Sequence, residues 1–262
     1  MVLGWNIFPG IAAAVFVLSL ISAVAALRNR ERSNAAIACS ATAIALFMLF
    51  IASLWVTLER PPLRTMGETR LWYSFFLLVA GLFTYYRWQY RWIMLFSTVL
   101  AGVFIIINIA KPEIHDQTLM PALQSVWFVP HVSVYMFSYS LLGCATLLSA
   151  TALMRRRQNF DLAIEKLLYA GLAFLSIGML TGSFWAKEAW GAYWRWDQKE
   201  AWAVATWALY LIALHLAPSV MNTKHRWLYH TTIILGFLAL QMCWYGINYL
   251  PSAETSIHTY NQ

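Results

Sequence analysis

The stretch SNAAIACSATAIALFMLFIASLWVTL, residues 33 to 58, contains no charged side chain and decides the class of fold. An α-helix needs about 20 consecutive apolar residues to cross a bilayer, and this run is long enough. Similar runs recur along the chain, at 1 to 27, 71 to 86, 92 to 110, 117 to 154, 167 to 186, 200 to 223 and 227 to 253, and all are charge-free except for Glu200 at the start of one. The sequence therefore predicts an all-α polytopic membrane protein with about eight transmembrane helices, the third marginal in length.

The composition agrees with this class. Of 262 residues, 61% are hydrophobic and 11% are charged, whereas soluble domains carry about 25% charged residues. Lipid must therefore solvate part of the apolar surface.

Arg28, Arg30 and Arg32 follow the first apolar run instead of preceding it, which is the reverse of signal-peptide order. We therefore expect that run to be a retained helix.

The Lys and Arg residues predict the orientation. Eleven of the 18 lie in alternate short loops, at 28 to 34, 87 to 91, 154 to 166 and 218 to 226. The positive-inside rule places these loops inside and both termini on the outer side. The net charge of +7 then reflects topology and contact with the lipid bilayer, and we expect no nucleic-acid partner.

Neither a linker nor a repeat divides the chain, so we expect a single transmembrane helical domain over residues 1 to 262. Cys39, Cys144 and Cys243 lie far apart within apolar runs. Without a C-x-x-C pair, the cysteines encode neither a dithiol redox centre nor a covalent c-type haem site.

Tryptophans and charges crowd one predicted external segment, residues 186 to 200, within the stretch 185-WAKEAWGAYWRWDQKEAW-202. Trp190 and Trp194 have helical i, i+4 spacing, and Gly191 would allow close approach. With Tyr193 and Trp196 they would form a shelf for a flat apolar ligand such as a porphyrin. The alternative is an ordinary aromatic belt at the membrane interface.

The charges of this segment suit such a ligand. Its three bases, Lys187, Arg195 and Lys199, could meet haem propionates. Its three acids, Glu188, Asp197 and Glu200, could pair with those bases or accept from indole N–H groups. A solvated loop with compensating charges would look the same at this level.

Two histidines share the predicted outer face with the tryptophans. His131 follows Pro130 where the chain enters the fifth helix, and His258 lies beyond the last one. Neutral imidazoles approaching from opposite sides would give six-coordinate haem iron. We expect His115, His225 and His230 to be solvated or interfacial.

His215 lies within the apolar run of the seventh helix, near its inner end. An ionisable side chain there is costly unless it is paired or functional, which favours an intramembrane site. A hydrogen bond to a neighbouring helix carbonyl is the equally weighted alternative.

The run 190-WGAYWRWDQKEAW-202 resembles the tryptophan-rich WWD motif of haem-handling proteins, and its form is similar to the CcsA/ResC branch of cytochrome c assembly proteins. The segments 127-WFVPHVSVYMFSYSLLG-143 and 244-WYGINYLPSAETSIHTY-260 also resemble that family, so the likeness covers roughly residues 66 to 260. The PSAET approach to His258 differs from the glycine-rich approach usual in the family.

The resemblance implies a system II cytochrome c synthase subunit in the bacterial inner membrane, with its functional face toward the periplasm. A CcsB/ResB-type membrane partner and an apocytochrome c bearing CXXCH would be its partners, and haem b (iron protoporphyrin IX) its cargo. His131 and His258 would ligate haem on the outer side, and His215 within the membrane. The WWD positions expected to bind haem are Trp190, Gly191, Tyr193, Trp194, Trp196, Asp197, Lys199, Glu200 and Trp202.

Two rival functions remain at this level. A transmembrane b-type electron carrier requires histidine pairs well inside the helices, where only His215 is clearly placed. A transporter or scaffold without haem requires only that the tryptophan segment anchor its loops.

Overall fold

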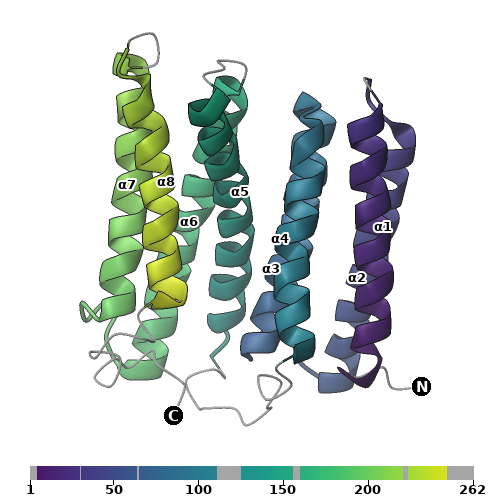
Figure 1. Ribbon diagram of the computed structural model, residues 1–262. Helices are drawn as coiled ribbons and strands as arrows, with labels where there is room; N and C mark the ends of the chain where they lie inside the picture. Colours follow the sequence, from purple (N-terminus) through teal and green to yellow (C-terminus); the bar gives the residue numbers. More distant parts are fainter. Residues whose placement is uncertain are drawn as a thin grey trace. The chain divides into compact units, whose positions relative to one another are not determined.

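The computed structural model describes residues 5–29, 31–63, 65–110, 125–155, 160–220 and 224–246. Over these residues the secondary structure is entirely helical, which confirms the all-α prediction (Figure 1). A short 3₁₀ helix, η1 (Trp5–Ile7), precedes eight α-helices. These are α1 (Phe8–Arg28), α2 (Asn34–Leu58), α3 (Met66–Trp88), α4 (Arg91–Ala110), α5 (Phe128–Arg155), α6 (Asp161–Trp190), α7 (Gln198–Val220) and α8 (Arg226–Trp244).

The helices form two compact units, one over residues 1–123 and one over residues 124–262. In the first unit, α1 packs on α2 and α4, and α3 packs on α4. In the second, α5 packs on α6 and α8, while α7 packs on α8 and α6. A single domain over the whole chain stays a prediction.

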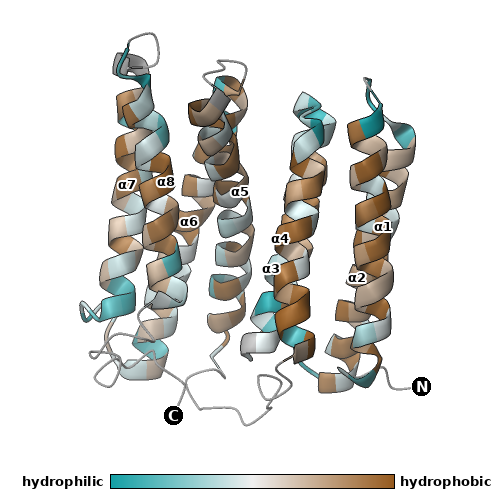
Figure 2. Cartoon of the chain, viewed as in Figure 1, coloured by the Kyte–Doolittle hydropathy of each residue, from teal (hydrophilic) through white to brown (hydrophobic). Residues whose placement is uncertain are grey.

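Seven helices of the described chain are long and apolar enough to cross a membrane. Their middles are hydrophobic, and polar residues gather toward their ends (Figure 2). Large apolar side chains point outward, for example Leu49, Val56 and Leu180, which are more than 60% exposed. Such a surface is stable where acyl chains cover it.

The remaining helix, α3, has 23 residues and is not short. It extends past its charge-free run to include Glu68, Arg70 and Arg87 at its two ends. Thr65 and Glu68 form a capping box in which each side chain accepts the other's backbone N–H, both at 3.1 Å. Arg60 binds both oxygens of the buried Glu68 carboxylate at 2.9 Å, so the charge at this helix end is paired.

Small residues let α6 approach α5 closely. A side chain at Gly171 would meet Leu142, one at Gly178 would overlap the ring of Tyr135, and one at Gly182 would meet His131. Glycine-mediated contact of this kind is the usual way for helices to pack in lipid. It brings the imidazole of His131 against the α6 backbone.

Candidate functional site

The tryptophan segment is the connection between α6 and α7. Helix α6 ends at Trp190, and Gly191 caps it with φ of 80°, in the left-handed region. The prediction that Trp190 and Trp194 share a helical face was therefore wrong, because residues 191 to 197 are not helical. Gly191 does not serve close approach either, since a side-chain carbon added there would have no neighbour within 4 Å. It supplies the positive φ that ends the helix.

The charged side chains of the segment hold its backbone. Lys187 donates to the carbonyl of Gly191 at 2.9 Å, and Arg195 donates to the carbonyl of Trp190. The buried carboxylate of Glu200 accepts the backbone N–H of Arg195 at 2.8 Å and that of Asp197 at 3.1 Å. Glu200 thereby joins the connection to the first turn of α7, where a carboxylate is favoured by the helix dipole.

Two of the rings in this connection are strongly exposed. Trp196 is 70% exposed and Tyr193 is 54% exposed. Trp196 also has φ of 58°, which is unusual for a large side chain. Its ring meets that of Trp194 edge to face, with centroids 5.7 Å apart. Local strain that exposes an apolar ring is a feature of binding sites.

Trp194 carries a buried polar atom with no hydrogen-bond partner in the described part of the chain, its indole Nε1. A buried N–H without an acceptor costs about 1–3 kcal/mol. An acceptor oxygen brought by a ligand would remove this cost.

His131 lies in the first turn of α5, as the sequence predicted, and its half-buried ring packs within an aromatic cluster. The ring stacks on Trp185 with centroids 5.3 Å apart and planes 24° apart, and it meets Tyr135 at 4.5 Å. Trp185 in turn contacts Trp190 at 4.7 Å. The cluster thus joins His131 to the start of the tryptophan segment.

A hydrogen bond determines which nitrogen of His131 carries the proton. Its Nδ1 lies 2.8 Å from the carbonyl oxygen of Gly178. Because a carbonyl can only accept, Nδ1 is the donor, and the neutral imidazole keeps a lone pair on Nε2. Iron-ligating histidines have this arrangement, with the other ring nitrogen bound to a carbonyl.

The aromatic contacts continue from His131 into the helices. Tyr135 stacks on Tyr139 at 5.4 Å, Tyr139 meets Trp244 at 5.9 Å, and Trp244 stacks on Tyr245 at 4.8 Å. Spacing of four residues along α5 places these rings on one face. The end of α8, which precedes the segment containing His258, is held against α5 by this series.

The other two predicted ligands have different outcomes. His258 lies outside the described residues. His215 is exposed on α7, and its Nδ1 lies 2.8 Å from the carbonyl oxygen of Leu211. That bond is the alternative that the sequence left open, yet it also leaves Nε2 with a lone pair. Ligation by His215 stays a prediction.

Lys199 and Trp202 lie in the first turns of α7, both half-buried. The backbone carbonyl of Lys199 accepts the thiol of Cys243 at 3.4 Å, which ties α7 to the end of α8. Haem binding by the nine positions of the WWD motif is not tested by these contacts and stays a prediction.

Sequence reasoning was wrong about His230. We expected it to be solvated or interfacial, but it is 1% exposed in the first turns of α8. The charge pattern did not reveal this, because Lys224, His225 and Arg226 precede it and make the region look like a solvated loop. The helical register of α8 places the side chain of His230 on the buried face of the helix.

Comparison with known proteins identifies the family of this chain. The family model described as "Cytochrome C assembly protein" matches residues 5–253. The chain belongs to that family. It is similar to the cytochrome c biogenesis protein CcsA of Oryza sativa, with 30% identity over 268 residues, which is 80% of this chain and 81% of the relative. CcsA of Zea mays is 31% identical over 269 residues, and CcsA of Oenothera biennis 26% over 262, with similar coverage.

Membership confirms the resemblance drawn from the WWD motif, and it shows a membrane protein of cytochrome c biogenesis. The segments that carried the resemblance belong to the second unit. In their described parts, ring contacts join His131 to Trp190 through Trp185, and to Trp244 through Tyr135 and Tyr139. The match with the family model also includes residues 5–65, which were outside the likeness read from the sequence.

Proposed function

We propose that this protein presents haem b at the outer face of the membrane for attachment to apocytochrome c, as the CcsA-type subunit of a system II synthase. The single observation that carries the proposal is the state of His131. Its Nδ1 is bound to the carbonyl of Gly178, which leaves the lone pair that an iron ligand needs on Nε2, and the aromatic contacts of its ring lead to the tryptophan segment.

The residues fit haem as a substrate in three respects. His131 offers the basic nitrogen. Trp196 and Tyr193 expose flat rings in the α6–α7 connection, whose first residues are joined to His131 through Trp185 and Trp190. Trp194 has a buried N–H that lacks an acceptor in the described chain, and a propionate oxygen is such an acceptor. His258 would supply the second outer ligand, and His215 an intramembrane one.

The role of this chain is to hold and orient its substrate. The thiols of the apocytochrome CXXCH would add across the haem vinyl groups. Each addition forms one S–C and one C–H bond, consumes the S–H bond and the vinyl π bond, and needs no oxidant. The hydrogen bonds of Glu200, Lys187 and Arg195 to the backbone keep the segment ordered while the thiols approach.

The remaining assignments belong to the same proposal. We infer a location in the bacterial inner membrane with the WWD face toward the periplasm, and a CcsB/ResB-type partner that completes the haem lyase complex. The b-type electron carrier and the haem-free scaffold are the alternatives. No contact in the described residues favours either of them over haem presentation.

The test is the visible spectrum and iron content of the full chain, purified in detergent after expression with its partner. His131→Ala and His258→Ala should each lose or shift a low-spin bis-histidine spectrum, and His215→Ala tests the intramembrane ligand. His225→Ala is the matched control, because this histidine is exposed beside α8. Wild-type protein without haem under haem-replete expression would move the scaffold function to first place.

A further inference from the structure

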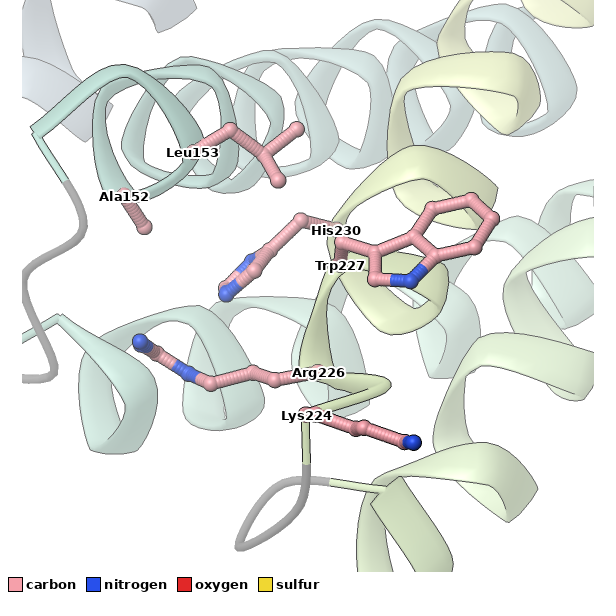
Figure 3. Close-up of a pocket in the computed structure, with 6 residues that line it drawn as sticks. All are labelled: Ala152, Leu153, Lys224, Arg226, Trp227 and His230. Carbon is pink, nitrogen blue, oxygen red and sulfur yellow. The ribbon is translucent and has the colours of Figure 1, made fainter.

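A cavity of about 530 Å³ opens at the ends of α5 and α8 that lie away from the tryptophan segment. Ala152 and Leu153 of α5 and Trp227 of α8 form an apolar part of its lining. Lys224, Arg226 and His230 supply nitrogen atoms, and none of the described residues that line it is acidic. The cavity therefore combines positive charge with an apolar wall (Figure 3).

His230 gives this cavity an unmet requirement for hydrogen bonds. Its side chain is buried and lines the cavity, yet neither ring nitrogen has a hydrogen-bond partner in the described part of the chain. The carboxylate of Asp161 is 4.0 Å from Nε2, too far for a hydrogen bond. A buried imidazole without partners is costly, and an anionic oxygen in the cavity would accept its N–H.

Arg226 places a fixed positive charge beside that imidazole. Its guanidinium is held by an ion pair with Asp161 of α6. Figure 3 shows the guanidinium and the imidazole of His230 extending to the same side, while the amine of Lys224 points the other way. Both groups approach Oδ1 of Asp161, so the two donors lie in one region, at the side of the cavity nearest α6.

We propose that this cavity binds the phosphate of an anionic phospholipid head group, with the glycerol and acyl chains against Leu153 and Trp227. The Lys and Arg tally places this end of the helices inside, where anionic lipids attract basic pockets between transmembrane helices. Trp227, 51% exposed, suits the level of the head groups. The proposal is independent of the haem function.

The experiment is native mass spectrometry of the detergent-purified full chain titrated with dihexanoyl phosphatidylglycerol. Dihexanoyl phosphatidylcholine, inorganic phosphate and haem are separate arms. We expect the phosphatidylglycerol complex to be favoured over the phosphatidylcholine complex. In His230→Leu its dissociation constant should rise about tenfold, the loss of one charge-assisted hydrogen bond.

The control and a second variant keep the result interpretable. His225→Leu makes the same chemical change outside the cavity lining and should leave the dissociation constant unchanged. Leu153→Trp fills the cavity, retains every charge and should also weaken binding, so the result does not depend on the folding of one variant. Equal binding of both lipids, or an unchanged constant in both cavity variants, would overturn the proposal. Free phosphate that binds as tightly as the lipid, or haem that displaces it, would overturn the lipid identity.

Discussion

The position of the His131 ring depends on two glycines of α6. The ring lies against Gly182, and its proton is held by the carbonyl of Gly178 one turn earlier on α6. These two contacts determine where the Nε2 lone pair points. A substitution in α6 can therefore move the proposed ligand without changing the ligand itself.

Gly182→Ala should lower the haem content of the purified protein several-fold. The added carbon would lie 2.6 Å from Cε1 and Nδ1 of His131, closer than real contacts allow, so the imidazole must shift. Iron content and the Soret position measure this effect. Gly171→Ala is the matched control, because it crowds Leu142 at 2.7 Å in the same α5–α6 interface. Equal haem loss in both variants would show that helix packing, and not His131, is responsible.

Gly191→Ala should destabilise the protein by about 1 kcal/mol, because the left-handed region costs an alanine this much. Space is not the cause, since nothing lies within 4 Å of the added carbon. Thermal unfolding in detergent measures the change. Gly10→Ala in α1, equally uncrowded and with ordinary helical φ, should leave the unfolding temperature unchanged or raise it. A Gly191 variant as stable as wild type would contradict this account of the cap.

At the scale of elements, charge-free runs predicted the helices well. In lipid the backbone N–H and C=O groups must be hydrogen-bonded within the segment, so a long apolar run forms a helix. The residues at which helices begin and end were harder to predict. Gly191 stops α6 between Trp190 and Trp194, which were expected to share a helical face, and the register of α8 buries His230 despite its basic neighbours. Both outcomes depend on where a helix begins or stops, which a run of apolar residues does not specify. The position of His131 in the first turn of α5 was predictable, because Pro130 marks the start of a helix.

The paired end of α3 carries its own prediction. Glu68→Ala removes the carboxylate that binds Arg60 and caps the helix, leaving Arg60, only 12% exposed, without this partner. Loss of one member of a buried pair costs about 3–5 kcal/mol. We expect a much lower unfolding temperature in detergent. Glu59→Gln, at an exposed neighbouring carboxylate, should change little, and a stable Glu68→Ala protein would show that α3 does not need the pair.

At the scale of the whole molecule, the orientation depends on α3. If α3 crosses, the chain has eight spans and both termini lie on one side, as the sequence predicts. If it does not, the loops before α3 lie on the opposite side from the prediction. Its 23 residues would measure about 34 Å as a helix, enough for the bilayer core of about 30 Å. Its contacts run along α4, from Gly67 against Asn108 to Gly81 against Ser97.

We therefore predict that α3 crosses the membrane. Single cysteines at the exposed positions Glu31, Glu59, Gln89 and Tyr193, in a chain whose three native cysteines are replaced by serine, can be labelled in intact cells with an impermeant maleimide. Positions 59 and 193 should react from outside, whereas 31 and 89 should react only after permeabilisation. Because α3 is the only helix of the described chain between positions 59 and 89, equal labelling of those two would mean that it does not cross. The polar ends of α3 support crossing, since Glu68 is paired and Arg87 lies at the end that the positive-inside rule assigns to the cytoplasm.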